Sequence, residues 1–151
     1  MKRSLIALFL FSLILLCGCT DQLEIRQNHC QKYIELNYSN YKSLKQDPIT
    51  IIEVKTEGDC LKLTLQYGGG CKEHQVDLAL ILPECGTPPL PPPTFEIRHD
   101  AKNDNCKALI TKDYSFDISG IREHSKTKTD FIISAKNSSG VNISKTYTYN
   151  Y

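Results

Sequence analysis

Apolar side chains recur at every second position through much of the chain after residue 48. In the clearest run, Leu61, Leu63, Leu65 and Tyr67 alternate with polar residues, the pattern of a β-strand with one buried and one solvated face. Six further segments show strand patterns, at 49–55, 76–82, 94–99, 114–118, 131–135 and 143–149. Because no long helical periodicity accompanies them, the sequence predicts an all-β domain of about seven strands, an antiparallel sandwich or a partly open barrel.

Turn-forming residues separate these segments. Glycine, asparagine, aspartate and serine gather at 57–59, 68–70 and 137–140, where turns are expected. Six of the seven prolines lie between Pro83 and Pro93. Since proline cannot pair in a central strand, we expect this stretch to be an exposed, polyproline-like connection.

Composition limits the class of protein. A chain of 151 residues with 40% hydrophobic and 23% charged residues has the composition of one ordinary globular domain. The net charge is +1 and falls to about −1 if Lys2 and Arg3 are removed with a leader. No basic field is present to hold a phosphate backbone, so a nucleic-acid partner is not expected.

The first eighteen residues have the features of a signal peptide. Lys2 and Arg3 precede an apolar run from Leu5 to Leu16, which is shorter than the roughly 20 residues that a membrane span needs. The sequence LCGC at 16–19 resembles a bacterial lipobox, in which the last cysteine, here Cys19, receives a diacylglycerol and becomes the new N-terminus. We therefore expect a removed lipoprotein signal peptide at 1–18, a lipidated tether at 19–48 and a single β-domain at 49–151.

The residue after the lipidated cysteine bears on location. Acyl chains on Cys19 would hold the domain at a bilayer without crossing it. In didermal lipoproteins an aspartate at the next position is the usual inner-membrane retention signal, and here the residue is Thr20. The resemblance therefore implies an outer-membrane lipoprotein, on the periplasmic or the cell-surface face.

Five cysteines remain after Cys17 and Cys19 are set aside: Cys30, Cys60, Cys71, Cys85 and Cys106. Outside the cytoplasm disulfide pairing is the default, and an odd number leaves one cysteine without a partner in the chain. Cys71 and Cys106 lie at loop ends, where a bridge leaves the strand ladders intact. A Cys71–Cys106 disulfide would close 36 residues and contribute about 3–4 kcal/mol. The pairing of the other three stays open.

Three short motifs carry a resemblance. They are GDCL at 58–61, YGGGCKEH at 67–74, and HDA at 99–101 followed by DNCKA at 104–108. Over about residues 49–121 the chain resembles a group of small secreted or lipid-anchored proteins of Bacteroidetes-type bacteria. The resemblance implies that Cys71 and Cys106 recur in the group and that Cys30, Cys60 and Cys85 are additions. It implies a location and a fold but no activity.

Cys71, His74, His99 and Cys106 also form the inventory of a Cys₂His₂ metal site. The strand phase directs both imidazoles inward, near the two sulfurs. Zinc requires thiolates, however, which an oxidising compartment removes, and the spacing differs from that of a zinc finger. We expect a disulfide flanked by hydrogen-bonded histidines and keep the metal site as the alternative.

Other candidate sites have plainer interpretations. Asp100, Asn103, Asp104 and Asn105 lack the spacing of a calcium loop and predict a solvated turn. The chain contains no nucleophile motif of a known hydrolase. The carboxylates Glu53, Asp77, Glu96 and Asp117 fall on solvated strand faces. The alternating Tyr147, Tyr149 and Tyr151 predict packing rather than a ligand platform.

These observations predict a non-enzymatic bacterial envelope lipoprotein without a cofactor, attached to the outer membrane through Cys19 and acting by binding or as a structural component. The alternative is a periplasmic metal-binding protein using Cys71, His74, His99 and Cys106, and a further alternative is a hydrolase with an unrecognised site. The sequence does not identify a protein or small-molecule partner.

Overall fold

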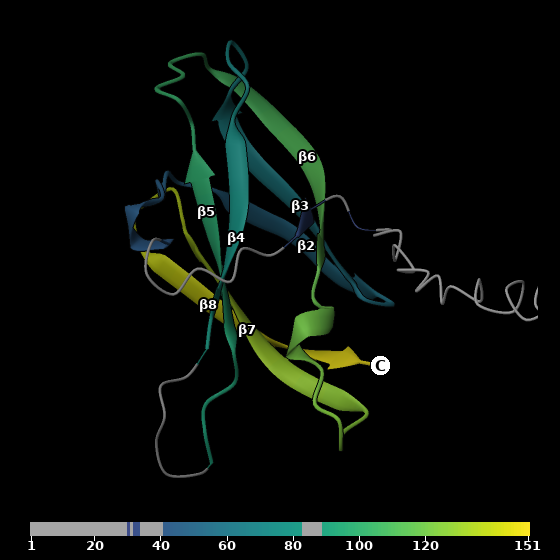
Figure 1. Cartoon of the computed structure of the whole chain (residues 1–151). Coiled ribbons are helices and arrows are strands. Elements are labelled where there is room, and N and C mark those ends of the chain that lie inside the picture. The colour runs from purple at the N-terminus through teal and green to yellow at the C-terminus, as the bar shows by residue number, and fades with distance from the viewer. Residues whose placement is uncertain (1–29, 31, 34–40, 83–88) are drawn as a thin grey trace, which may run out of the picture.

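The computed structural model describes residues 30, 32–33, 41–82 and 89–151, which form two facing four-stranded sheets (Figure 1). The first sheet has the order β1-β6-β3-β2, with β1 at Lys32–Tyr33, β2 at Thr50–Glu57, β3 at Cys60–Gly69 and β6 at Ala108–Asp117. The second has the order β4-β5-β7-β8, with β4 at Gln75–Ile81, β5 at Thr94–Asp100, β7 at Lys128–Lys136 and β8 at Asn142–Asn150. Two 3₁₀ turns are present, η1 at Tyr41–Ser43 and η2 at Ser119–Ile121. The prediction of an all-β sandwich is confirmed.

The hydrophobic core lies between the sheets, and the period-two pattern identified much of it. All four apolar side chains of the β3 run, at 61, 63, 65 and 67, are buried. From the second sheet, Phe95 and Phe131 meet edge to face with ring centroids 5.4 Å apart, and Tyr149 is fully buried. Aromatic rings of this size contribute a large share of the apolar area that a small domain buries.

Several details differ from the sequence prediction. The sheets are mixed rather than purely antiparallel, because β1 pairs with β6, and β5 with β7, in parallel. Strand β6 begins at Ala108 rather than at Tyr114, since its first half is largely exposed on both faces and shows no alternation. Leu82, assigned to the buried face, lies beyond the end of β4 and is exposed. Strand β1 lies upstream of residue 49, where we had placed the start of the domain.

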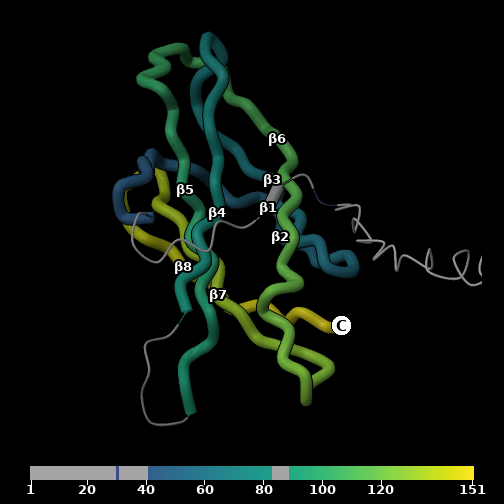
Figure 2. The backbone as a smooth tube through the Cα atoms, in the orientation of Figure 1, coloured from purple at the N-terminus to yellow at the C-terminus, as the bar shows by residue number. Residues whose placement is uncertain are grey.

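The chain crosses between the two sheets twice at one end of the sandwich, at the top of Figure 2. Residues 70–74 carry the chain from β3 to β4, and residues 101–107 carry it from β5 back to β6. Because β3 pairs with β6 and β4 with β5, the two crossings lie beside each other. The strand pairs Gly69–Ala108 and Gln75–Asp100 flank them.

Within the part of the chain that the structure describes, no helix has the length and apolar character needed to cross a bilayer.

Replacing Phe131 by Ala tests the core. Phe131 is fully buried and packs against the rings of Phe95 and Tyr147, so its truncation leaves a cavity and should lower the free energy of unfolding by about 3–5 kcal/mol. Urea unfolding measures the difference. The control Leu109→Ala, at a side chain that is 70% exposed, should change stability by less than about 0.5 kcal/mol. Equal effects of the two substitutions would contradict the assignment of the core.

Candidate functional site

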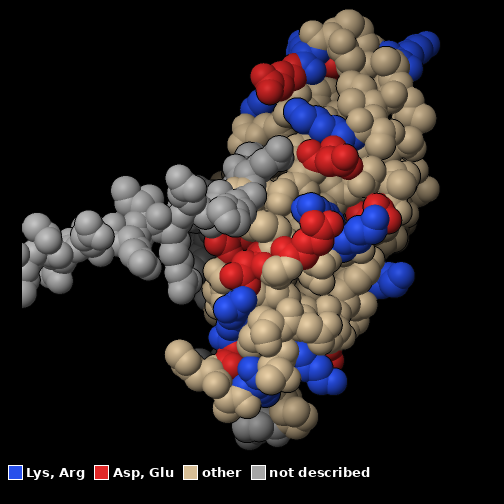
Figure 3. Space-filling model, turned by 90° about the vertical axis from the view of Figure 1, so that its right-hand side faces the viewer, with Lys and Arg blue, Asp and Glu red and all other residues tan. Residues whose placement is uncertain are grey.

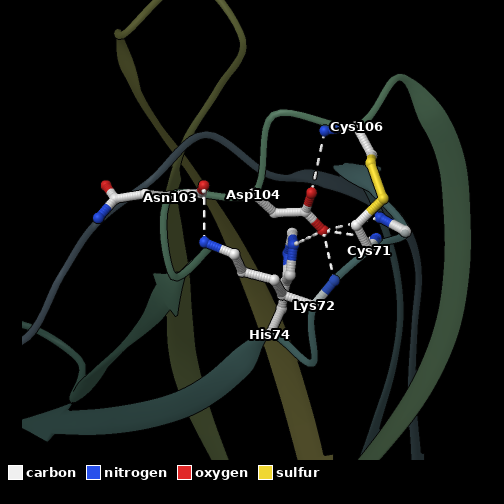
Figure 4. The surroundings of a disulfide bond; sticks show 7 residues. Cys71, Lys72, His74, Asn103, Asp104 and Cys106 are labelled. Carbon is white, nitrogen blue, oxygen red and sulfur yellow. Dashed lines mark hydrogen bonds and ion pairs between the residues drawn. A yellow bond between two sulfur atoms is a disulfide. The ribbon is translucent and has the colours of Figure 1, made fainter.

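A disulfide between Cys71 and Cys106 ties the two crossings together, with the Cα atoms 5.8 Å apart (Figure 4). We call residues 69–75 and 99–108 the disulfide corner. A second disulfide joins Cys30 to Cys60, with Cα atoms 5.6 Å apart, a pairing that the sequence had left open. Cys85 lies outside the described residues.

The carboxylate of Asp104 occupies the centre of the disulfide corner. Its Oδ2 atom accepts the backbone N–H groups of Gly70, Cys71 and Lys72, each at 2.9 Å, and its Oδ1 atom accepts the N–H of Cys106 at 2.9 Å (Figure 4). Only 1% of the side chain is exposed. Asp104 therefore holds the first crossing with one oxygen and the second crossing with the other.

These hydrogen bonds favour the ionised form of Asp104. The N–H of Cys106 does most to hold the pKa of this carboxyl far below its ordinary value. The N–H groups of Lys72 and Cys71 and the ring of His74 act in the same direction, while burial opposes them. Asp104 is thus an ionised acceptor across the ordinary pH range.

A tight turn directs Asp104 inward. Lys102 and Asn103 both adopt left-handed backbone conformations, with φ of 53° and 54°, which side chains other than glycine adopt infrequently. The ammonium of Lys72 donates to the carbonyl oxygens of both residues, at 2.9 and 3.1 Å, and so holds the turn. We had expected Asp104 to belong to a solvated turn; the turn is present, but this carboxylate is buried.

His74 and His99 lie side by side inside the corner, as the strand phase predicted. Nδ1 of His74 is 2.9 Å from Nε2 of His99, and Nε2 of His74 is 3.3 Å from Oδ2 of Asp104. At the far end, Nδ1 of His99 lies 3.3 Å and 3.2 Å from the carbonyl oxygens of Asp47 and Pro48. Burial lowers the pKa of His99, and the hydrogen bonds to these two carbonyls partly offset the effect.

Tyr67 covers the histidine pair from β3. Its ring centroid is 4.8 Å from that of each imidazole, and its hydroxyl lies 2.9 Å from that of Tyr114. The close approach depends on Gly69, whose φ is +149°, because a Cβ atom there would lie 2.5 Å from Nε2 of His74. The glycine run at 68–70 was predicted as a turn, and its middle residue instead makes room for a buried ring.

Residues 41–49, which we call the strap, close the site from the other side. The carboxylate of Asp47 accepts the N–H of Ala101 at 2.8 Å, and the N–H of Asp47 donates to the carbonyl of His99 at 2.8 Å. The ring of Tyr41 lies under the guanidinium of Arg98, 5.2 Å from ring centroid to Cζ. Most of the strap falls in the segment that we had assigned to the tether, because it shows no periodic pattern.

The residues of the other candidate sites make contacts within the domain. Both sulfurs of the alternative metal set are joined to each other, and the ring nitrogens of its two histidines contact protein groups. The four carboxylates lie on four different strands, and Glu53 pairs with Lys55 at 2.9 Å and Glu96 with Arg98 at 2.9 Å.

The C-terminal tyrosines pack within the domain. Tyr147 stacks on Phe131 with ring centroids 5.9 Å apart, and Tyr151 lies 4.9 Å from the ring of Tyr149. The hydroxyl of Tyr151 is also 2.9 Å from that of Thr129. This arrangement agrees with the packing role that the alternating pattern predicted.

The hollows described on the surface are open to solvent. One hollow of about 410 Å³ lies over β2, β3 and β6 and is lined by charged side chains, of which Lys55 pairs with Glu53 and Lys62 with Glu57. In the view of Figure 3, basic and acidic side chains are interspersed and form no field of a single sign.

Comparison with known proteins places the fold. The family model described as the NigD-like C-terminal β-sandwich domain matches residues 32–151. No curated protein sequence matches the chain. The match begins at β1 and so includes the strap.

Three solved structures share the fold. A NigD-like immunity protein from Bacteroides caccae is 17% identical, with a TM-score of 0.58 over 78% of this chain and 61% of its own. A putative toxin-related protein from Parabacteroides distasonis is 21% identical, with a TM-score of 0.62 over 78% of this chain and 59% of its own. A protein of unknown function from Bacteroides vulgatus is 19% identical, with a TM-score of 0.58 over 80% of this chain and 56% of its own. The chain thus spans about three fifths of these neighbours.

Replacing Asp104 by Asn tests the role of the buried carboxylate. The amide presents an NH₂ group to backbone N–H donors, so the urea midpoint should fall well below that of the control Glu73→Gln, an exposed acid in the same corner. A lowered pKa in the folded state means that wild-type stability from this group is present above the unfolded aspartate pKa of about 4 and is lost as the pH falls below it. The Asn variant should lack this component, and an identical acid dependence in both proteins would contradict the assignment.

Replacing Cys71 and Cys106 together by Ala tests the disulfide. In the chain-entropy model, freeing this loop should lower the free energy of unfolding by about 3–4 kcal/mol, measured by urea unfolding. The matched comparison is the double variant Cys30→Ala and Cys60→Ala. Its sequence separation of 30 is close to the 35 of the corner bridge, so the same model predicts a similar loss of stability. No loss of stability in the corner variant would be inconsistent with the structure.

Proposed function

The chain belongs to the NigD-like C-terminal β-sandwich family, and on that basis we propose that it is a lipid-anchored protein of the bacterial envelope that acts by binding a protein partner, without catalysis. The observation that carries the proposal is the lipobox-like LCGC sequence ending at Cys19, thirteen positions before β1. A lipidated Cys19 would hold the sandwich close to a membrane surface. The Thr20 that follows supports the outer membrane as its location.

The disulfides support a compartment outside the cytoplasm. Four of the five cysteines that follow the anchor form two intramolecular bonds, and such bonds persist where the surroundings are oxidising. The second bond attaches Cys30, which lies within the proposed tether, to the first residue of β3. A pull on the tether would therefore be transmitted to a central strand of the first sheet.

The disulfide corner supports a role other than catalysis. An aspartate–histidine pair acts in catalysis when the second ring nitrogen is left to take a proton from a nucleophile. Here the second nitrogen of His74 contacts His99, whose own second nitrogen faces two backbone carbonyls. Both rings are buried, so the described residues that resemble a relay contact one another instead of a substrate.

The surface favours a protein as the partner. Small-molecule sites are usually concave and bury most of their ligand, whereas the hollows described above are open and one is lined by ion pairs. One structural neighbour is described as a NigD-like immunity protein and another as a putative toxin-related protein. We propose a binding role of the same general kind, recognition of another protein at the envelope.

Replacing Cys19 by Ala tests the anchor. The variant should lose incorporation of radiolabelled palmitate and move from the membrane fraction to the soluble periplasmic or extracellular fraction, because the acyl chains supply the membrane affinity. The matched control is Cys17→Ala, which changes a cysteine of the leader two positions earlier and should keep both label and membrane retention. A Cys19→Ala protein that stays in the membrane fraction would refute the proposed attachment.

A further inference from the structure

The two buried histidines form part of a line of four groups. Asp104 lies at one end, the carbonyls of Asp47 and Pro48 lie at the other, and His74 and His99 are between them. Four contacts connect the line: 3.3 Å from Asp104 to His74, 2.9 Å between the two rings, and 3.3 and 3.2 Å from His99 to the two carbonyls. Each contact is a hydrogen bond only if one proton lies between its two heavy atoms.

Both ends of the line accept hydrogen bonds and cannot donate. The two oxygens of Asp104 receive four backbone N–H groups, which hold the carboxyl in its ionised, acceptor-only form. Backbone carbonyl oxygens accept only. The outward-facing nitrogen of each ring, Nε2 of His74 and Nδ1 of His99, must therefore carry a proton.

The central contact then lacks a proton if both rings are neutral. A neutral imidazole carries one N–H, and in each ring the end of the line already requires it. Two neutral rings would place two unprotonated nitrogens 2.9 Å apart in a buried site, and unsatisfied buried polar atoms are costly. Two fully protonated rings would place two N–H groups against each other. Three protons on the four ring nitrogens satisfy every contact.

We propose that the His74–His99 pair is a binding site for one additional proton, shared across the Nδ1···Nε2 contact, and that this proton joins the two segments of the disulfide corner, of which the second contacts the strap through His99. The inference stands apart from the proposed function, because it depends only on the described interior. Loss of the proton breaks the central hydrogen bond, and a second added proton creates N–H repulsion. The connection is therefore complete in one protonation state of the pair.

The surroundings favour placing the charge on His74. Its Nε2 atom faces the ionised Asp104, with which it forms a buried ion pair when protonated. Burial holds the pKa of His99 below its ordinary value, which favours the neutral ring there. The face of Tyr67 lies 4.8 Å from the His74 ring and nearly parallel to it, an arrangement that stabilises a cation.

Other charged groups near the pair are engaged elsewhere. The titratable and charged groups around it are Asp47, Tyr67, Lys72, Glu73, Asp100, Lys102, Asp104 and Tyr114. Lys72 donates to backbone carbonyls of the turn, and Lys102 pairs with Asp100 at 2.8 Å. Asp47 accepts the N–H of Ala101. Asp104 is left as the ionised group in contact with a ring nitrogen.

Proton linkage gives the pair a characteristic effect on stability. Each histidine can bind one proton beyond the single N–H of its neutral ring. Above the unfolded histidine pKa of about 6.5, the two histidines of the unfolded chain have lost both of these extra protons and the folded pair keeps one, so stability falls as the pH rises. Below that value the unfolded chain binds two protons and the folded pair one, so stability falls as the pH drops. On each side the equilibrium constant for unfolding should change by up to tenfold per pH unit.

Nitrogen NMR of the full chain, labelled with ¹⁵N-histidine, counts the protons directly. The four ring nitrogens of His74 and His99 are assigned from spectra of His74→Phe and His99→Phe. At pH 6.5–7 three of the four should give the chemical shifts of protonated nitrogens and one that of an unprotonated nitrogen. Two unprotonated nitrogens among the four would overturn the proposal. Because the chain also contains His29 and His124, the count is repeated in a protein that carries His29→Gln and His124→Gln, which leaves only the four ring nitrogens of the buried pair even if a His74 or His99 variant folds poorly.

The pH dependence of unfolding supplies the second readout. Wild-type stability to urea should have a maximum near neutral pH with the slopes given above. The alkaline slope should be lost in His74→Phe, because a lone His99 contacts only backbone carbonyls and needs no extra proton. The matched control His124→Gln changes an exposed histidine and should keep the maximum. If the free energy of unfolding of the wild-type protein does not fall as the pH rises above 6.5, the shared proton is refuted.

Discussion

The buried carboxylate of Asp104 is the interaction on which the arrangement of the sandwich depends. The two sheets exchange strands at one end through two neighbouring crossings, and each crossing leaves backbone N–H groups outside the strand ladders. Asp104 accepts three of them from residues 70–72 and one from Cys106. A buried charge is tolerated only when hydrogen bonds replace its lost hydration, and here those bonds come from both crossings at once. The adjacent disulfide holds the same two segments covalently.

The remaining polar groups of the interior extend this arrangement toward the strap. His74 contacts Asp104, His99 contacts His74, and the carbonyls of residues 47 and 48 end the line. Tyr67 packs against both rings, and Gly69 leaves the space that they need. Three segments far apart in the sequence are thereby joined by polar contacts inside an otherwise apolar core. Groups used in this way are consistent with the binding role that we propose, because they contact one another and the backbone.

Much of the fold could be predicted, because a half-buried strand can be recognised from its own sequence. Side chains of a strand alternate between two faces, so the apolar positions of β3 and β7 reveal both the strand and its buried side. The same rule predicted from the sequence that the side chains of His74 and His99 point inward. The rule gives no signal where a strand is exposed on both faces, or where a segment packs without a regular buried face. The first half of β6 is exposed on both sides, and the strap packs through individual contacts at Tyr41 and Asp47 without a period.

The sequence by itself determined the all-β class, the seven main strands, the inward phase of the two histidines and the cysteines available for pairing, because these follow from local periodicity and composition. Only the tertiary structure decided the parallel pairings, the partner of Cys30, the burial of Asp104 and the line of contacts from Asp104 to Pro48. Each of these depends on residues that are 25 or more positions apart meeting in space. No local pattern encodes such a meeting: an aspartate in a polar turn looks the same in the sequence whether it faces water or four backbone N–H groups.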